Sequence, residues 1–127
     1  MLTNSLLTTT IPVADVKRTK DFFVNKLGLS VDNETATGIT FKAGGNTKIY
    51  AYKRGPSKAD HTLASFAVDN IEAAIDELVK NGVVFEQYDF PGLKTNEKGI
   101  SISEVEGIKG AWFKDPDGNI FAINEPM

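Results

Sequence analysis

The chain has 127 residues, 41% of them hydrophobic and 24% charged, with a formal net charge of −3 and no cysteine. That length is enough for one domain with its own hydrophobic core. The lack of cysteine excludes disulfides, thiol catalysis and thiolate metal sites. The negative charge and the lack of a basic patch argue against nucleic-acid binding. No apolar run is long enough to span a membrane, and the first residues do not resemble a signal peptide, so the expected location is the cytoplasm.

The first half of the chain predicts one strand, one helix and three further strands. Apolar and polar residues alternate over residues 7–13, which indicates a half-buried strand. Asp15 is placed to cap the helix, and Gly28 is placed to end it, because glycine readily adopts the left-handed conformation found at helix C-termini. Three short strands are expected near residues 31–33, 38–42 and 48–54.

The second half repeats this order after a linker that contains glycine, proline and serine. Residues 62–68 alternate as in a strand, Asn70 is placed to cap a helix, and Gly82 is placed to end it. The rest is expected to be a strand at 83–90, an irregular connection at 91–109, and a closing hairpin of residues 110–114 and 120–125. We therefore expect a single domain, 1–127, with repeat one at about 6–54, the linker at 55–61 and repeat two at about 62–125.

The repeat predicts an α+β fold. Each copy is too small to bury its own apolar face, so the two copies are expected to stack as curved sheets with the helices on the convex outside. The opposite faces would line a concave cup, and such a cup is a natural place for a small molecule.

Four segments carry a resemblance to a known family. They are Ile11–Val16 (IPVADV), Phe22–Phe23, Leu27–Leu29 (LGL) and Trp112–Asn119 (WFKDPDGN). With the repeat, they make the chain resemble the vicinal oxygen chelate superfamily, which includes glyoxalase I, extradiol dioxygenases, fosfomycin resistance enzymes and bleomycin-binding resistance proteins. The resemblance implies two βαβββ repeats that form paired curved mixed sheets with a concave cup, the glyoxalase/bleomycin resistance fold. It also implies a homodimer.

The resemblance allows a test for a metal site. Enzymes of this superfamily hold a divalent metal with a His or Gln in the first strand of each repeat and a Glu in the last strand. The matching positions here are Thr8, Leu63 and Ala122. A metal site needs several nitrogen or oxygen donors at fixed distances, and these three side chains supply one weak donor between them. We therefore expect no metal site of the usual kind and no cofactor.

Other residues are candidates for a ligand site in the cup. Tyr50 and Tyr52 share one face of a strand, and tyrosines offer both a flat apolar surface and a hydroxyl. Trp112 is the only tryptophan, and the sequence does not assign it to a face. His61 is the only histidine and is a weak candidate for a ligand or a general base, with a half-exposed residue at a strand start as the alternative. The complete set of predicted cup residues is Thr8, Thr10, Tyr50, Tyr52, Leu63, Ser65, Trp112 and Ala122.

Three functions remain open at this point. The first is a protein that binds a small organic molecule in the cup without a metal, so that protection against the molecule is simple mass action. The alternative is an enzyme of the same superfamily, similar to its lyases, isomerases or dioxygenases, that uses a relocated metal site or His61 as a base. The third is a scaffold whose cup is filled by side chains.

Overall fold

The computed structural model describes all residues, 1–127, and the chain forms two compact units. Unit 1 comprises Met1–Lys58 together with Pro116–Asn119, and unit 2 comprises Ala59–Asp115 together with Ile120–Met127. The boundary after Lys58 falls within the predicted linker, so the units follow the two repeats except for one turn. None of the helices combines the length and the apolar character needed to cross a membrane.

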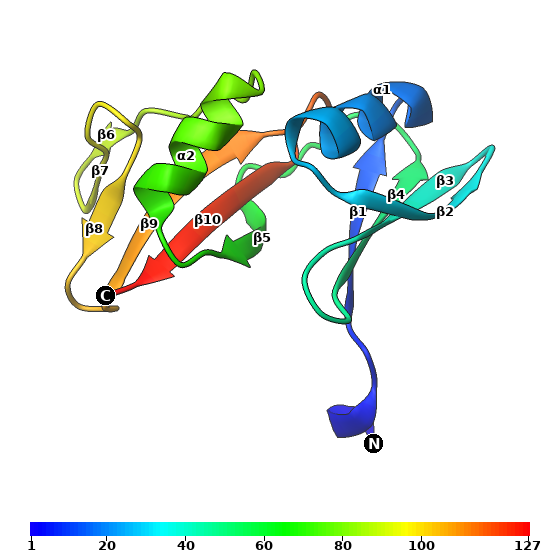
Figure 1. Ribbon diagram of the computed structural model, residues 1–127, viewed down its shortest axis with the longest axis horizontal. Coiled ribbons are helices and arrows are strands. Elements are labelled where there is room, and N and C mark those ends of the chain that lie inside the picture. Colours follow the sequence, from blue (N-terminus) through cyan, green and yellow to red (C-terminus); the bar gives the residue numbers. More distant parts are fainter. The chain divides into compact units, whose positions relative to one another are not determined.

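Unit 1 contains one four-stranded mixed sheet and a helix (Figure 1). Its elements are the short helix η1 (Leu2–Asn4), β1 (Thr8–Val13), α1 (Val16–Asp21), the π-helical segment η2 (Phe22–Lys26), β2 (Ser30–Thr35), β3 (Gly38–Lys42) and β4 (Lys48–Lys53). The strand order is β1-β4-β3-β2, with β1 parallel to β4 and the other pairs antiparallel. The strands therefore form where the sequence predicts them, with Leu7 exposed outside β1.

The helical segment of unit 1 covers one face of this sheet. Asp15 caps α1 by accepting hydrogen bonds from the backbone N–H groups of Lys17 and Arg18. The segment ends as predicted near Gly28, which has a φ of 76°. It buries its apolar side chains against alternate residues of the strands, and the resulting core consists of Ile11, Val13, Phe22, Phe23, Ile39, Phe41, Ile49 and Ala51.

Unit 2 repeats this plan and adds a small hairpin (Figure 1). Its elements are β5 (Thr62–Ala67), α2 (Ile71–Lys80), β6 (Asp89–Phe90), β7 (Leu93–Lys94), β8 (Ser101–Ser103), β9 (Ile108–Lys114) and β10 (Ile120–Pro126). The strand order is β5-β10-β9-β8, which matches the order in unit 1, and β6 pairs with β7 as a separate two-stranded sheet. Both repeats thus have the βαβββ order, and the α+β fold class is confirmed.

The strand predicted at 83–90 is wrong. Val83 and Phe85 are buried, but the segment pairs only through an isolated bridge from Phe85 to Phe113 and through the two-residue β6. The edge strand β8 instead comes from the predicted irregular connection. Side chains in this segment alternate between core and solvent without a continuous ladder of backbone hydrogen bonds, so it does not form a strand.

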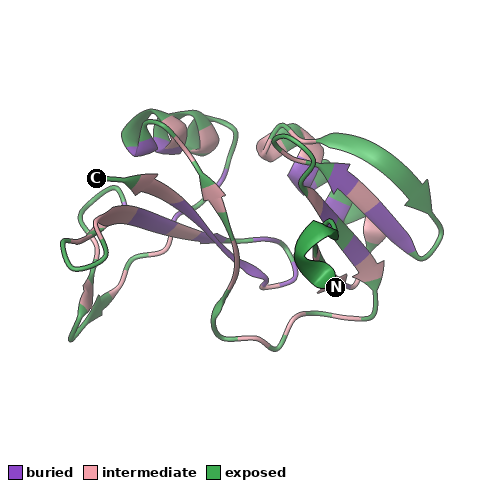
Figure 2. Ribbon diagram, turned by 90° about the horizontal axis from the view of Figure 1, so that it is seen from below, coloured by how far each residue is buried: buried purple, intermediate pink, exposed green.

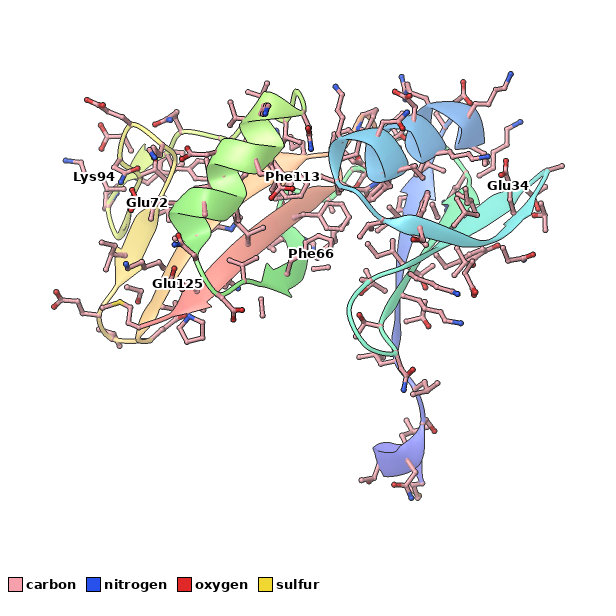
Figure 3. The ribbon with its side chains drawn as sticks, in the orientation of Figure 1. Glu34, Phe66, Glu72, Lys94, Phe113 and Glu125 are labelled. Carbon is pink, nitrogen blue, oxygen red and sulfur yellow. The ribbon has the colours of Figure 1, made fainter.

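Helix α2 covers one face of the second sheet, and it is anchored at its start. Asn70 accepts a hydrogen bond from the backbone N–H of Ala73, and Glu125 of β10 accepts one from that of Ile71 at 2.8 Å. Figure 3 shows Glu125 near the first turn of α2.

Many of the buried residues of unit 2 lie on β9 and β10, whereas all of β2 in unit 1 is exposed (Figure 2).

Candidate ligand cavity in the second repeat

Unit 2 contains a cavity of about 540 Å³ on the face of its sheet opposite α2. Its walls come from the sheet, from the β6–β7 hairpin and from the turn between β8 and β9. The lining residues are Thr62, Ser65, Gly92, Leu93, Ser101, Ile102, Ser103, Glu104, Val105, Glu106, Ile108, Gly110, Trp112, Ala122 and Asn124. The volume lies within the range of about 300–1,000 Å³ that is usual for small-molecule sites.

Trp112 is the one large aromatic side chain among the lining residues. It lies on β9 directly opposite Ala122 of β10, and Ala122 in turn pairs with Ser65 of β5. These three residues point to the same face because directly paired residues in a sheet do so. Their neighbours Phe113 and Phe121 are buried on the α2 face, which settles the side of the sheet that Trp112 occupies.

A glycine allows the Asn124 side chain to lie close to strand β9, next to Trp112. A Cβ atom built on Gly110 would be 3.2 Å from Oδ1 of Asn124 and 3.5 Å from the nearest atom of the Trp112 ring. Both side chains therefore cover the backbone of the same residue. The Asn124 carboxamide and the Trp112 indole N–H make no hydrogen bond to another protein group, so both are available to a ligand.

Two further aromatic rings extend the surface around Trp112. The ring centroid of Tyr88 is 5.7 Å from that of Trp112 in an edge-to-face arrangement, and Phe90 follows at 6.0 Å from Tyr88. Burial of the Tyr88 hydroxyl, together with the nearby negative charge of Glu86, raises the pKa of Tyr88 above its ordinary value. Tyr88 is therefore a neutral hydrogen-bonding group at physiological pH.

The predicted cup residues are divided between the two units. Ser65, Trp112 and Ala122 come together in the cavity of unit 2. The remaining residues lie in unit 1, apart from Leu63, and share the face of its sheet opposite α1: Thr8, Thr10, Tyr50 and Tyr52.

The aromatic residue that corresponds to Trp112 lies on a different strand in unit 1: Tyr50 is on β4, which corresponds to β10, whereas Trp112 is on β9. Tyr50 of β4 pairs with Thr40 of β3, just as Ala122 of β10 pairs with Trp112 of β9. The Tyr50 and Tyr52 rings stack with centroids 6.3 Å apart. The Tyr50 ring lies over Gly38, whose Cβ would be 2.6 Å from the tyrosine hydroxyl oxygen if one were present.

Leu63 and His61 do not line the cavity. The register between β5 and β10 passes from Thr62 to Ala64, so Leu63 is the extra residue at an irregularity, and Thr62 and Ser65 face the cavity instead. His61 precedes β5, its side chain is 70% exposed, and its Nδ1 lies 3.6 Å from Oδ1 of Asp60. His61 would face the cup only if β5 began before it, but the strand begins at Thr62.

The residues of this chain do not fit the metal site that the resemblance implies. No group of three or more His, Cys, Asp or Glu side chains is arranged to hold a metal ion. Ala122 lies in the cavity wall without a donor atom, and Glu125 faces the other side, where it accepts from the N-terminus of α2. Glu86 is 3.2 Å from Nζ of Lys114. Glu86 and Glu125 therefore each have a partner within the fold, and they do not converge on one point.

Part of the cavity wall is not predicted from the sequence. Ser101 and Ser103 lie on β8, in the range 91–109 for which the sequence predicts an irregular connection. Gly110 lies on the predicted hairpin strand 110–114, where no pattern assigns it to the cavity. The alternation of Ile100 and Ile102 was the available signal, since it is the period of a strand. Ser103 is held in place by its hydroxyl oxygen, which accepts a hydrogen bond from the backbone N–H of Glu106.

Comparisons with known proteins support the architecture. The family model described as Glyoxalase/Bleomycin resistance protein/Dioxygenase superfamily matches residues 5–123. A glyoxalase family protein from Enterococcus faecalis is 22% identical, with 98% of this chain and 100% of that chain covered and a TM-score of 0.74. No curated protein matches the sequence.

Two structural neighbours are described by their relation to antibiotics. TnmS3, an antibiotic binding protein from Streptomyces sp. CB03234, is 23% identical, with coverage of 100% and 99% and a TM-score of 0.70. The fosfomycin resistance protein FosX from Mesorhizobium loti is 12% identical, with coverage of 98% and 93% and a TM-score of 0.68. At these identities the likeness establishes the fold and leaves the ligand open.

Proposed function

The chain belongs to the Glyoxalase/Bleomycin resistance protein/Dioxygenase superfamily, and we propose that it binds a small organic molecule in the cavity of unit 2 without a metal ion. The observation that carries the proposal is the position of Trp112 beside Asn124 in that cavity. Trp112 offers an apolar surface for stacking, and Asn124 offers a free donor and a free acceptor. Small-molecule sites commonly combine an apolar surface with a few polar groups in this way.

The alternatives have less support. A scaffold with a filled interior does not account for a cavity of about 540 Å³. An enzyme that uses His61 as its base would need that side chain in reach of the ligand, but His61 is exposed outside the cavity wall. Sequestration requires only binding, and an antibiotic, as for TnmS3, is one kind of ligand that such a cavity suits. The homodimer and the cytoplasmic location remain predictions.

The single tryptophan provides a direct test. In a ¹⁵N-labelled sample its indole N–H gives one resolved signal, which can be followed during titration with a panel of small aromatic compounds in the presence of a chelator. We expect a saturable shift of this signal and a rise in thermal stability that grows with ligand concentration. The variant Trp112→Leu should lose the stabilisation, whereas Val79→Ser on the exposed face of α2 should keep it. Binding that disappears with the chelator would instead support a relocated metal site.

A further inference from the structure

The cavity of unit 2 carries negative charge and no positive charge in its lining. Glu104 and Glu106 line it at the turn after β8, and none of the lining residues is Lys, Arg or His. The lysines of the surrounding elements are each close to a carboxylate: Lys114 lies 3.2 Å from Glu86, Lys94 lies 3.8 Å from Asp89, and Lys109 lies 3.8 Å from Glu125. The charged side chains of the cavity lining are therefore both acidic, which favours cations over anions there.

The polar groups on the sheet wall of the cavity are neutral and can hydrogen-bond. Asn124 presents a carboxamide without a protein partner. Ser65 of β5 pairs with Ala122, which lies two residues before Asn124 on β10. The carboxamide and the benzene ring of the Trp112 indole both lie over Gly110. An aromatic ligand stacked on Trp112 thus places its edge within reach of a group that both donates and accepts.

We propose, on the premise that the cavity binds an aromatic ligand, that it selects uncharged or cationic compounds, rejects anionic ones and uses Asn124 to hold a polar atom at the ligand's edge. An anion that enters loses its hydration without gaining a cationic partner. A cation keeps a favourable field from Glu104 and Glu106 and gains attraction to the face of Trp112. Phosphonate and carboxylate ligands are therefore disfavoured.

Three probes that share the quinoline ring system test the charge selection. Quinoline is neutral, N-methylquinolinium is a cation, and quinoline-2-carboxylate is an anion. Titration of the Trp112 indole signal with each probe gives three dissociation constants at one site. We expect quinoline and N-methylquinolinium to bind at least about fivefold more tightly than the carboxylate at low salt. Added salt should reduce the difference between these dissociation constants.

Paired variants locate the source of the selection. The double variant E104Q/E106Q should reduce the preference for the cation over the anion by about two- to fivefold. The control E77Q/E97Q removes the same charge from exposed positions of unit 2 outside the cavity and should leave the preference unchanged. The isosteric variant Asn124→Leu should weaken quinoline binding by roughly three- to tenfold through loss of a hydrogen bond to the ring nitrogen. N-methylquinolinium has no acceptor at that nitrogen and should be affected less.

The outcomes separate this inference from the proposed function. If none of the probes shifts the indole signal, the proposed aromatic ligand and the selection both fail. If all three shift it with equal affinity, the cavity binds aromatic compounds and only the selection is overturned. Equal weakening of quinoline and N-methylquinolinium by Asn124→Leu would remove the role of Asn124 alone.

Discussion

Arg18 and Asp117 lie 99 residues apart in sequence, and Nη2 of Arg18 donates to Oδ1 of Asp117 at 2.9 Å. The same oxygen accepts from the backbone N–H of Ala14 at 3.0 Å, and the Asp117 side chain is fully buried. Next to it, Nδ2 of Asn119 donates to the carbonyl oxygen of Pro12 at 2.9 Å. The turn that carries the family resemblance therefore holds the end of β1 and the start of α1 within unit 1, which gives the motif a structural role.

Replacement of Asp117 should destabilise unit 1. Asp117→Ala removes the acceptor for the Ala14 N–H and for Arg18, and we expect a loss of about 1–3 kcal/mol in the free energy of unfolding. The midpoint of urea unfolding measures this loss. Glu34→Ala is a matched control, because the Lys20–Glu34 pair is exposed on both sides and should contribute less than about 1 kcal/mol. Equal effects of the two variants would contradict the role assigned to the turn.

Gly38 should control the position of the Tyr50 ring. A Cβ at residue 38 would lie 2.6–2.9 Å from three atoms of Tyr50, so Gly38→Ala must move the ring away and disrupt its stack with Tyr52. Because Tyr50 is 37% exposed, the ring can turn into solvent, and the loss of about 0.5–1.5 kcal/mol from stacking is offset by a similar gain from replacing a strand glycine. Nuclear Overhauser contacts between the two rings report the change.

The control is the same glycine substitution in a protein that lacks the Tyr50 ring. In a protein that already carries Tyr50→Ala, the substitution Gly38→Ala meets no ring and should be stabilising. If Gly38→Ala destabilises both backgrounds equally, the close approach of Tyr50 is not the reason for the glycine.

Tyr88 should titrate above the ordinary tyrosine pKa of 10.0, chiefly because of burial and secondly because of Glu86. A raised pKa in the folded state means that the stabilisation is present below pH 10 and is lost as the pH rises through the folded-state pKa. The difference in tyrosinate absorbance between the wild type and Tyr88→Phe isolates this group. Glu86→Gln should lower the pKa of Tyr88 only in part, because burial remains; a return to the ordinary value would assign the whole shift to the charge.

The fold could be predicted from the sequence because the signals within each repeat are local. Asp15 and Asn70 cap their helices, Gly28 has the left-handed backbone expected of it, and the alternation at 7–13 and 62–68 corresponds to β1 and β5. Each of these signals depends on residues close together in the chain. The prediction failed at 83–90, where burial alternates but the strand partner is absent.

The cavity was harder to predict because it depends on register. The sequence predicts that Leu63 of β5 faces the cavity, by its distance from the helix cap Asn70. The irregularity between β5 and β10 instead turns Thr62 and Ser65 toward the cavity. A shift of one residue reverses the face of every side chain in a strand. The face that Trp112 occupies follows from its pairing with Ala122, a contact between strands that no local pattern in the sequence indicates.

Gly110→Ala tests whether the close packing of Asn124 against β9 positions the Trp112 ring. The new methyl would be 3.2 Å from Oδ1 of Asn124, so the carboxamide must shift by a few tenths of an ångström, while its 3.5 Å approach to Trp112 is ordinary contact. We expect a shift of the indole N–H signal with little change in stability, within about 0.5 kcal/mol. In an Asn124→Ala background the same substitution should leave the signal nearly unchanged. Gly44→Ala, which has nothing within 4 Å of its new methyl, is the control for a glycine substitution without contact, and an equal shift from it would refute the assigned role.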